Sequence, residues 1–179
     1  MRFPILLAAL SLAACSQAPT ASDPAALAAA KVDSELQPVR AAMARFSSFE
    51  QAKKADYTYL FNGACFADPT EGAMGYHYVN TALLDATVDA MAPEAVMYEP
   101  QANGSLKLVG LEYVVPKPAW TGDAPPRLFG QDYSYNATFD LYTLHVWLYQ
   151  ANPAGMFTGW NPTVTCANAP ASLTQEQHH

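Results

Sequence analysis

The sequence has little charge, and positive charge is especially scarce. Charged residues make up 14% of the 179 residues, and nine Lys and Arg against sixteen Asp and Glu give a net charge of −7. Proteins that bind nucleic acid gather Lys and Arg into patches that contact phosphates. The sequence contains no such basic stretch, so its composition argues against nucleic acid as a partner.

The chain also lacks the short motifs that identify common enzyme classes. It has no G-x-S-x-G, no H-E-x-x-H, no phosphate-binding P-loop and no dinucleotide-binding fingerprint. The hydrolases, zinc proteases and nucleotide-dependent enzymes that rely on these motifs are therefore disfavoured. Enzymatic activity stays an open alternative, because a His/Glu pair can act as general base and acid without any of these motifs.

Cysteine is also rare, and the first of the three cysteines, Cys15, directly follows a segment that is typical of an export signal. Residues 1–14 have a basic start and a short apolar run, which is too short to span a bilayer. The block Leu12-Ala13-Ala14-Cys15 resembles the lipobox of bacterial lipoproteins, in which the cysteine thiol carries the lipid. This resemblance implies anchoring through Cys15, at the outer membrane because Ser16 follows in place of aspartate, facing the periplasm or the cell surface. An ordinary secretory signal is the alternative, and it also exports the protein.

The two remaining cysteines, Cys65 and Cys166, are expected to form a disulfide. Cysteines of an exported domain meet an oxidising compartment and most simply pair with each other. A bridge that closes a loop of about a hundred residues stabilises by about 4 to 5 kcal/mol in the chain-entropy model. A metal site with two thiolate ligands is the alternative.

The length and the changes in composition predict one domain. Residues 15–36 are rich in Ala, Ser, Pro and Thr and contain no aromatic residue, which predicts a flexible tether, with a short helix at 24–32 as the alternative. Residues 37–166 have the size of a single domain. Residues 167–179 are expected to form a disordered tail, which carries two of the four histidines.

The apolar periodicity predicts an α+β fold, with an N-terminal amphipathic helix packed on a curved antiparallel sheet and a C-terminus held by the disulfide. Asn103-Gly104 is a strong hairpin signal between two strands. The glycine-rich segment around His77 is expected to be an irregular loop. The expected helices are 38–55 and a short one from Thr81 to Asp89, and the expected strands are 94–99, 106–115 and 138–149.

Four ionisable residues in apolar surroundings are the candidate site. His77 and His145 are the only histidines outside the tail, and Glu99 and Glu112 lie in strands that are almost free of charge. Buried groups of this kind are costly unless they are paired, hydrogen-bonded or bound to a metal. Two imidazoles and a carboxylate suit one ion of Zn, Fe, Mn or Cu. The alternatives are a hydrogen-bonded core network that only specifies the fold, and a site for a small polar ligand.

The expected hairpin register separates the two glutamates. With Asn103-Gly104 as the central turn residues, Glu99 faces Leu108, and Glu112 lies four residues farther along, roughly 13 Å away. One metal cannot bind both. We therefore expect a site of His77, Glu112 and His145, with Glu99 apart from it or as an outer partner.

Four sequence blocks between about residues 40 and 166 carry a resemblance to known proteins: GACFADPTEGAMGYHYVN, PEAVMYEP, LKLVGLEYVVP and LHVWLYQANPAGMFTGWNPTVTC. Together they resemble a family of uncharacterised secreted bacterial proteins. The resemblance implies export and a shared fold, and the family pattern has matching residues at His77, Glu99, Glu112 and His145. A further histidine often precedes the last block in this family, whereas this chain has Thr138-Phe139-Asp140 there.

Overall fold

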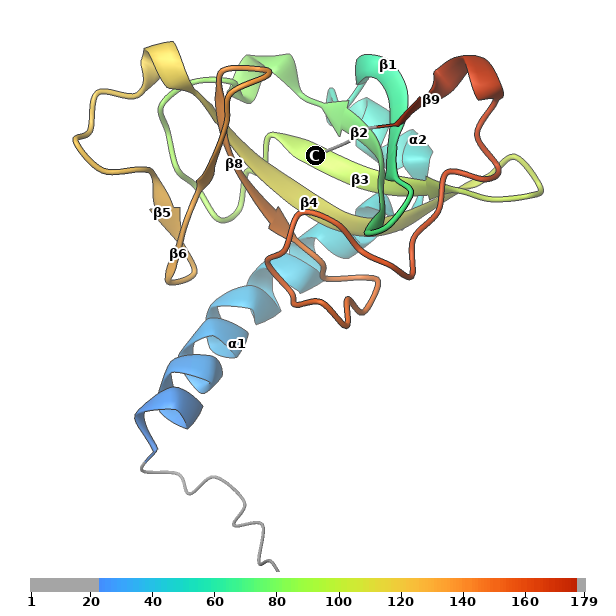
Figure 1. Cartoon of the computed structure of the whole chain (residues 1–179). Coiled ribbons are helices and arrows are strands. Elements are labelled where there is room, and N and C mark those ends of the chain that lie inside the picture. The colour runs from blue at the N-terminus through green and yellow to red at the C-terminus, as the bar shows by residue number, and fades with distance from the viewer. Residues whose placement is uncertain (1–22, 177–179) are drawn as a thin grey trace, which may run out of the picture.

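Seven strands form one curved sheet in the computed structural model, which describes residues 23–176 (Figure 1). The strand order is β7-β8-β4-β3-β2-β1-β9, and every neighbouring pair is antiparallel except β1 and β9, which are parallel. The expected signal peptide and Cys15 lie outside the described residues. The strands are β1 (Tyr59–Asp68), β2 (Gly72–Val79), β3 (Ala95–Pro100), β4 (Leu106–Pro116), β7 (Ser134–Asn136), β8 (Leu141–Val146), β9 (Thr174–Glu176) and a separate hairpin of β5 (Arg127–Leu128) and β6 (Gln131–Asp132).

Helices pack on one face of this sheet, which confirms the expected α+β fold. Leu36, Val39 and Met43 are the buried residues of α1, and the Tyr98 hydroxyl of β3 donates a hydrogen bond to the carbonyl of Phe46 at 2.6 Å. No helix among the described residues is long and apolar enough to cross a membrane. The helices are α1 (Pro24–Met43), α2 (Phe49–Lys54) and the short 3-10 helices η1 (Ala44–Ser47), η2 (Thr81–Leu83), η3 (Lys117–Ala119) and η4 (Ala171–Leu173).

The first helix begins earlier than expected, inside the segment that we assigned to a tether. The Asp23 side chain accepts a hydrogen bond from the Ala25 N–H, and Pro24 occupies the first turn. These features and the run of alanines are typical of a helix start, whereas Pro38, the expected start, lies inside the helix. The extended backbone of Ser48 then separates α2 from η1, so residues 38–55 are not one helix.

The segment around His77 forms a β-strand, so the prediction of an irregular loop there was wrong. Residues 72–79 form β2, between β1 and β3. Gly75 has a φ of 87° and passes close to the carbonyl of Tyr98, where a Cβ atom would clash, so its glycine permits the strand to pair there.

The short helix expected from Thr81 to Asp89 is also reduced, to the single turn η2. The side chains of Asp85 and Asp89 accept hydrogen bonds from the N–H groups of Thr87 and Met91. Such local bonds compete with helix formation.

The hairpin register differs by one residue near its turn. Gln101 to Ser105 form the connection, so Glu99 faces Lys107 and not Leu108. A β-bulge between Met97 and Tyr98 takes up the difference, and Ala95 then faces Glu112. The last long strand is shorter than residues 138–149, because the positive φ of Asp140 precedes β8 and Trp147 bonds to Met156 instead of a strand.

The C-terminal segment is part of the sheet. Cys65 and Cys166 form the expected disulfide, with Cα atoms 5.9 Å apart. The chain after Cys166 was expected to be disordered, yet its residues 174–176 form β9 and pair with β1 beside the disulfide. Because the covalent link holds this segment next to β1, pairing of the short strand costs less conformational entropy. His178 and His179 lie outside the described residues.

Removal of the disulfide should destabilise the protein strongly. The bridge spans 101 residues, so we expect the double substitution C65S/C166S to lower the free energy of unfolding by about 4 kcal/mol. Urea denaturation followed by circular dichroism measures this change. Reduction of the unsubstituted protein should have the same effect, and an unchanged urea midpoint in both experiments would contradict the prediction.

Glu94 should make stability depend on pH. It is 3% exposed and accepts a hydrogen bond from the Val114 N–H at 2.7 Å. Burial raises its pKa to about 7 from an ordinary 4.5, and Asp85 and Asp89 add to this increase. Because the folded pKa is the higher one, Glu94 stabilises fully below pH 4.5, and this contribution is lost as the pH rises through 7.

Glu94→Gln keeps the hydrogen-bond acceptor and removes the titration. From pH 5 to pH 8, we expect the free energy of unfolding of the unsubstituted protein to fall relative to that of E94Q, by about 2 kcal/mol. Urea titrations of both proteins across this range measure the difference. Parallel pH profiles would show that Glu94 does not titrate with a raised pKa.

Candidate metal centre

Three strands bring His77, Glu112 and His145 together on the concave face of the sheet. Glu112 of β4 is the direct cross-strand partner of His145 on β8. On its other side Glu112 pairs with Ala95 of β3, and His77 lies one strand farther away on β2. His77 is opposite Met97 and Glu112 is opposite Ala95, two residues apart on β3, so His77 and Glu112 approach each other diagonally across this strand.

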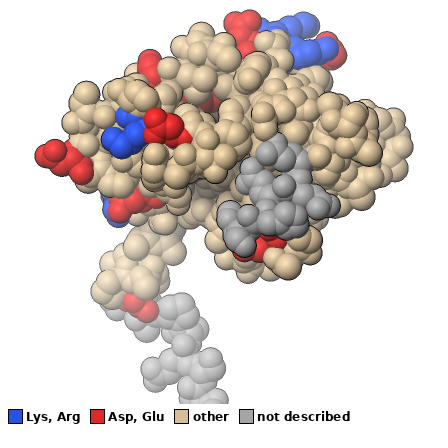
Figure 2. Space-filling model, turned by 45° about the horizontal axis from the view of Figure 1, so that its top comes forward, with Lys and Arg blue, Asp and Glu red and all other residues tan. Residues whose placement is uncertain are grey.

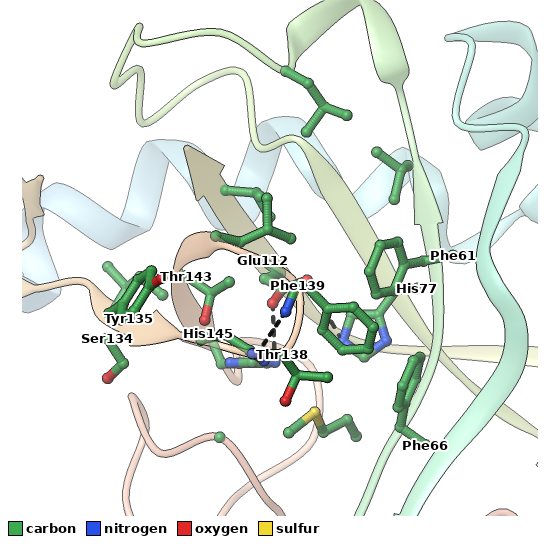
Figure 3. A pocket seen from close by; sticks show the side chains of 18 of the residues that line it. Phe61, Phe66, His77, Glu112, Ser134, Tyr135, Thr138, Phe139, Thr143 and His145 are labelled. Atoms are coloured by element: carbon green, nitrogen blue, oxygen red, sulfur yellow. Dashed lines mark hydrogen bonds and ion pairs between the residues drawn. The ribbon is translucent and has the colours of Figure 1, made fainter. Parts of the chain in front are cut away.

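The three side chains converge on one point, as Figure 3 shows. Glu112 Oε1 lies 3.4 Å from His145 Nε2, and Glu112 Oε2 lies 3.7 Å from His77 Nε2. One ligand atom of each residue lies within 4.8 Å of the others. Two atoms that bind a tetrahedral Zn²⁺ at about 2.1 Å are about 3.4 Å apart. The group could therefore hold a metal ion after small side-chain movements.

Both histidines have a buried nitrogen without a hydrogen-bond partner among the described residues: Nδ1 of His77 and Nε2 of His145. The side chains of His77, Glu112 and His145 are 4%, 13% and 9% exposed. Folded proteins rarely leave buried polar atoms unsatisfied, and each exception needs an explanation such as an ion or a catalytic role. This pattern is what a ligand set has before the metal is added.

Burial also sets the protonation of the site. It lowers the pKa of His77 to about 3, with a further contribution from His145, and lowers the pKa of His145 to about 4. It raises the pKa of Glu112 to about 8, with a further contribution from the charge of Glu94. At neutral pH the imidazoles are neutral, so their contacts with Glu112 are not ion pairs, and their lone pairs are available to a metal.

Glu99, the fourth candidate residue, lies outside this group. Its Oε1 accepts a hydrogen bond from the Thr165 N–H at 3.0 Å, and its Oε2 is 3.7 Å from Lys107 Nζ. This carboxylate is satisfied by protein groups and helps to hold the segment before Cys166. Glu99 is not one of the three residues whose ligand atoms lie together.

The three residues face a pocket with a cavity volume of about 830 Å³. Sequence reasoning did not find the other residues that line it. Of these residues, Thr143 could most easily have been predicted from the sequence, because it is two residues before His145 on β8 and so faces the same side of the sheet. The lining includes three phenylalanines and three residues with hydroxyl groups: Phe61, Phe66, Phe139, Ser134, Thr138 and Thr143.

No protein-family model, curated protein or solved structure matches the chain. Its function must therefore be inferred from the geometry of the site. Two imidazoles and one carboxylate could supply three ligands to a metal ion, and its remaining coordination positions would then face the pocket.

Substitution of Glu112 and of Glu99 tests whether the His/Glu group stabilises the folded protein. If the His/Glu group serves binding, its desolvated carboxylate does not stabilise the metal-free protein, and Glu112→Leu should leave the free energy of unfolding unchanged or raise it. Glu99→Leu is the matched control: it breaks the bonds with Thr165 and Lys107 and should cost about 2 kcal/mol. Urea denaturation in the presence of a chelator compares them. A loss in E112L as large as that in E99L would instead identify a network that maintains the fold.

Proposed function

We propose that this protein is an exported, lipid-anchored envelope protein that binds one transition-metal ion through His77, Glu112 and His145. The observation that carries the proposal is the convergence of these residues from three different strands, together with unpartnered nitrogens on both histidines. Three separate strands would have to place them together by coincidence if the group had no common ligand.

The main alternative, a core network that only specifies the fold, fits these contacts less well. Such a network is favourable when each of its members is hydrogen-bonded. Here Glu112 Oε1 lies 3.4 Å from His145 Nε2, and this buried nitrogen has no hydrogen-bond partner among the described residues. Nδ1 of His77, which is not the nitrogen 3.7 Å from Glu112, also has none. A metal ion would use lone pairs that the protein leaves without partners.

The donor set indicates the class of metal. Imidazole and carboxylate ligands suit Zn, Fe(II), Mn and Cu, and the two cysteines within residues 23–176 offer no thiolate because they are bonded to each other. Among these ions, Zn²⁺ in catalytic sites and Fe(II) in facial-triad sites are held by three protein ligands of this kind.

A metal-dependent enzyme is the second candidate function. It is favoured by the position of the three ligands at the surface of a cavity of about 830 Å³, because a purely structural metal site is usually closed by a fourth protein ligand. A small molecule in the pocket would lie against the open coordination positions. The residues of the site would then bind and orient the metal next to this molecule.

The proposed anchor is consistent with the position of α1. Residues 24–35, the first half of this helix, are exposed or partly exposed and extend beyond the sheet (Figure 1). Cys15, the proposed lipid attachment site, lies nine residues before Pro24. The helix would thus act as a spacer between the membrane and the domain.

Metal analysis of the purified protein tests the proposal. After incubation with Zn, Fe(II), Mn or Cu and removal of free metal, we expect about one ion per chain for at least one metal. H77A and H145A should each bind it at least tenfold more weakly, because a site with three protein ligands loses one of them. Elemental analysis and competition with a chelator measure both quantities.

The tail offers a matched control. The double substitution H178A/H179A also removes imidazoles but leaves the proposed ligands His77, Glu112 and His145 intact, so this variant should retain the metal. Thermal unfolding shows whether H77A and H145A are folded. Retention of stoichiometric metal by both site variants, or no binding of any of the four metals by the unsubstituted protein, would refute the proposal.

A further inference from the structure

The pocket beside the candidate metal centre has two chemically different sides (Figure 3). Phe61 and Phe66 lie on the side of His77, whereas Ser134, Tyr135 and Thr143 lie on the opposite side. The Glu112 and His145 side chains lie between them. A ligand that fills the pocket would therefore contact an aromatic surface and a hydroxyl-bearing surface at once.

The aromatic side is a cluster of rings in mutual contact. Phe61 is 4.9 Å from Phe139 and 5.9 Å from Phe66, measured between ring centroids. Phe66 in turn contacts His77 edge to face, at 5.5 Å. Phe61 and Phe139 are only partly buried although they line the pocket. Covering their open faces with an aromatic ring would remove apolar surface from water and add ring–ring contacts.

The opposite side presents hydroxyl groups that no protein group uses. The side-chain hydroxyls of Ser134 and Thr143 line the pocket on this side, and that of Thr138 lies nearer its centre (Figure 3). None of the three forms a hydrogen bond to another residue within the part of the chain that the structure describes. A ligand hydroxyl could donate to and accept from such groups, because each is both a donor and an acceptor.

Charge narrows the class of ligand further. None of the described residues that line the pocket is Lys or Arg, and its only carboxylates are Glu112 and Asp132. Asp132 is already paired with Arg127 at 2.6 Å. On the face shown in Figure 2, uncharged residues predominate, and Lys and Arg occur in small groups beside Asp and Glu. An anionic ligand would find no protein cation in the pocket.

We infer that the pocket binds a neutral aromatic molecule that carries a hydroxyl group, with its ring on Phe61 and Phe139 and its hydroxyl towards Thr143 and the metal centre. The inference rests on the proposed function only where the ligand hydroxyl meets the metal. The contacts with the phenylalanine rings and with Thr143 do not require a metal. Ligand binding and metal binding can therefore be tested separately.

Three probes with the same ring system test the inference: 2-naphthol, 2-naphthoate and 2-naphthylmethylammonium, which are neutral, anionic and cationic at pH 7. Isothermal titration calorimetry of the full chain, treated with a chelator, should show that 2-naphthol binds at least tenfold more tightly than either charged probe. The same titration with metal-loaded protein then reports whether the metal adds affinity for 2-naphthol.

Two substitutions locate the bound probe. F139L should weaken 2-naphthol binding about fivefold, because it removes the ring contact. T143V has nearly the same shape and should also weaken it about fivefold, by removing a hydrogen bond. F49L is the matched control: Phe49 is also partly buried but packs on Tyr78 and Tyr98, and its substitution should leave the affinity unchanged.

The outcomes separate this inference from the proposed metal site. Binding of 2-naphthol that is weakened in F139L and T143V supports the inference even if the protein binds no metal. Tighter binding of either charged probe to chelator-treated protein, equal effects of F139L and F49L, or no binding of 2-naphthol with or without metal would each overturn it.

Discussion

The structure depends on the burial of β3 on both of its faces. All six residues of this strand are buried, so side chains that alternate along it must satisfy two different environments. Val96 and Tyr98 belong to the core under the helices, where Tyr98 bonds to Phe46. Ala95 and Met97 face the other way, opposite Glu112 and His77 respectively. One strand thus separates an apolar core from a layer of ionisable groups.

The buried ionisable groups, which are costly to desolvate, thus lie on the opposite face of the sheet from the apolar core. The helix side contributes packing of aromatic and aliphatic residues, and the disulfide adds stability that does not depend on the pocket. The concave side holds two imidazoles whose pKa is lowered by burial and a carboxyl whose pKa is raised by burial. Such a division is expected where binding conflicts with stability.

Local patterns in the sequence predicted the parts of the fold that depend on local chemistry. The hairpin at Asn103-Gly104, the disulfide and the convergence of His77, Glu112 and His145 follow from turn residues, cysteine number and the scarcity of buried ionisable groups. Strands β2 and β9 could not be predicted in this way, whereas the early start of α1 does have local signals in Asp23, Pro24 and the run of alanines. Gly75 is typical of a loop until its contact with Tyr98 is known, and β9 pairs with β1 at Cys65, which is bonded to Cys166. Both strands depend on contacts between residues that are far apart in the sequence.

The span of the disulfide has a consequence for the order in which the protein matures. Cys65 and Cys166 are 101 residues apart, so a chain exported with its N-terminus first, as proposed, would present Cys65 as a free thiol before Cys166 follows. Three thiols permit three different pairings, and Cys15 would be the first competitor to reach the oxidising compartment. Acylation of Cys15, as proposed, would leave a single possible pairing. Lipid attachment would then protect the fidelity of oxidative folding as well as fixing the protein to a membrane.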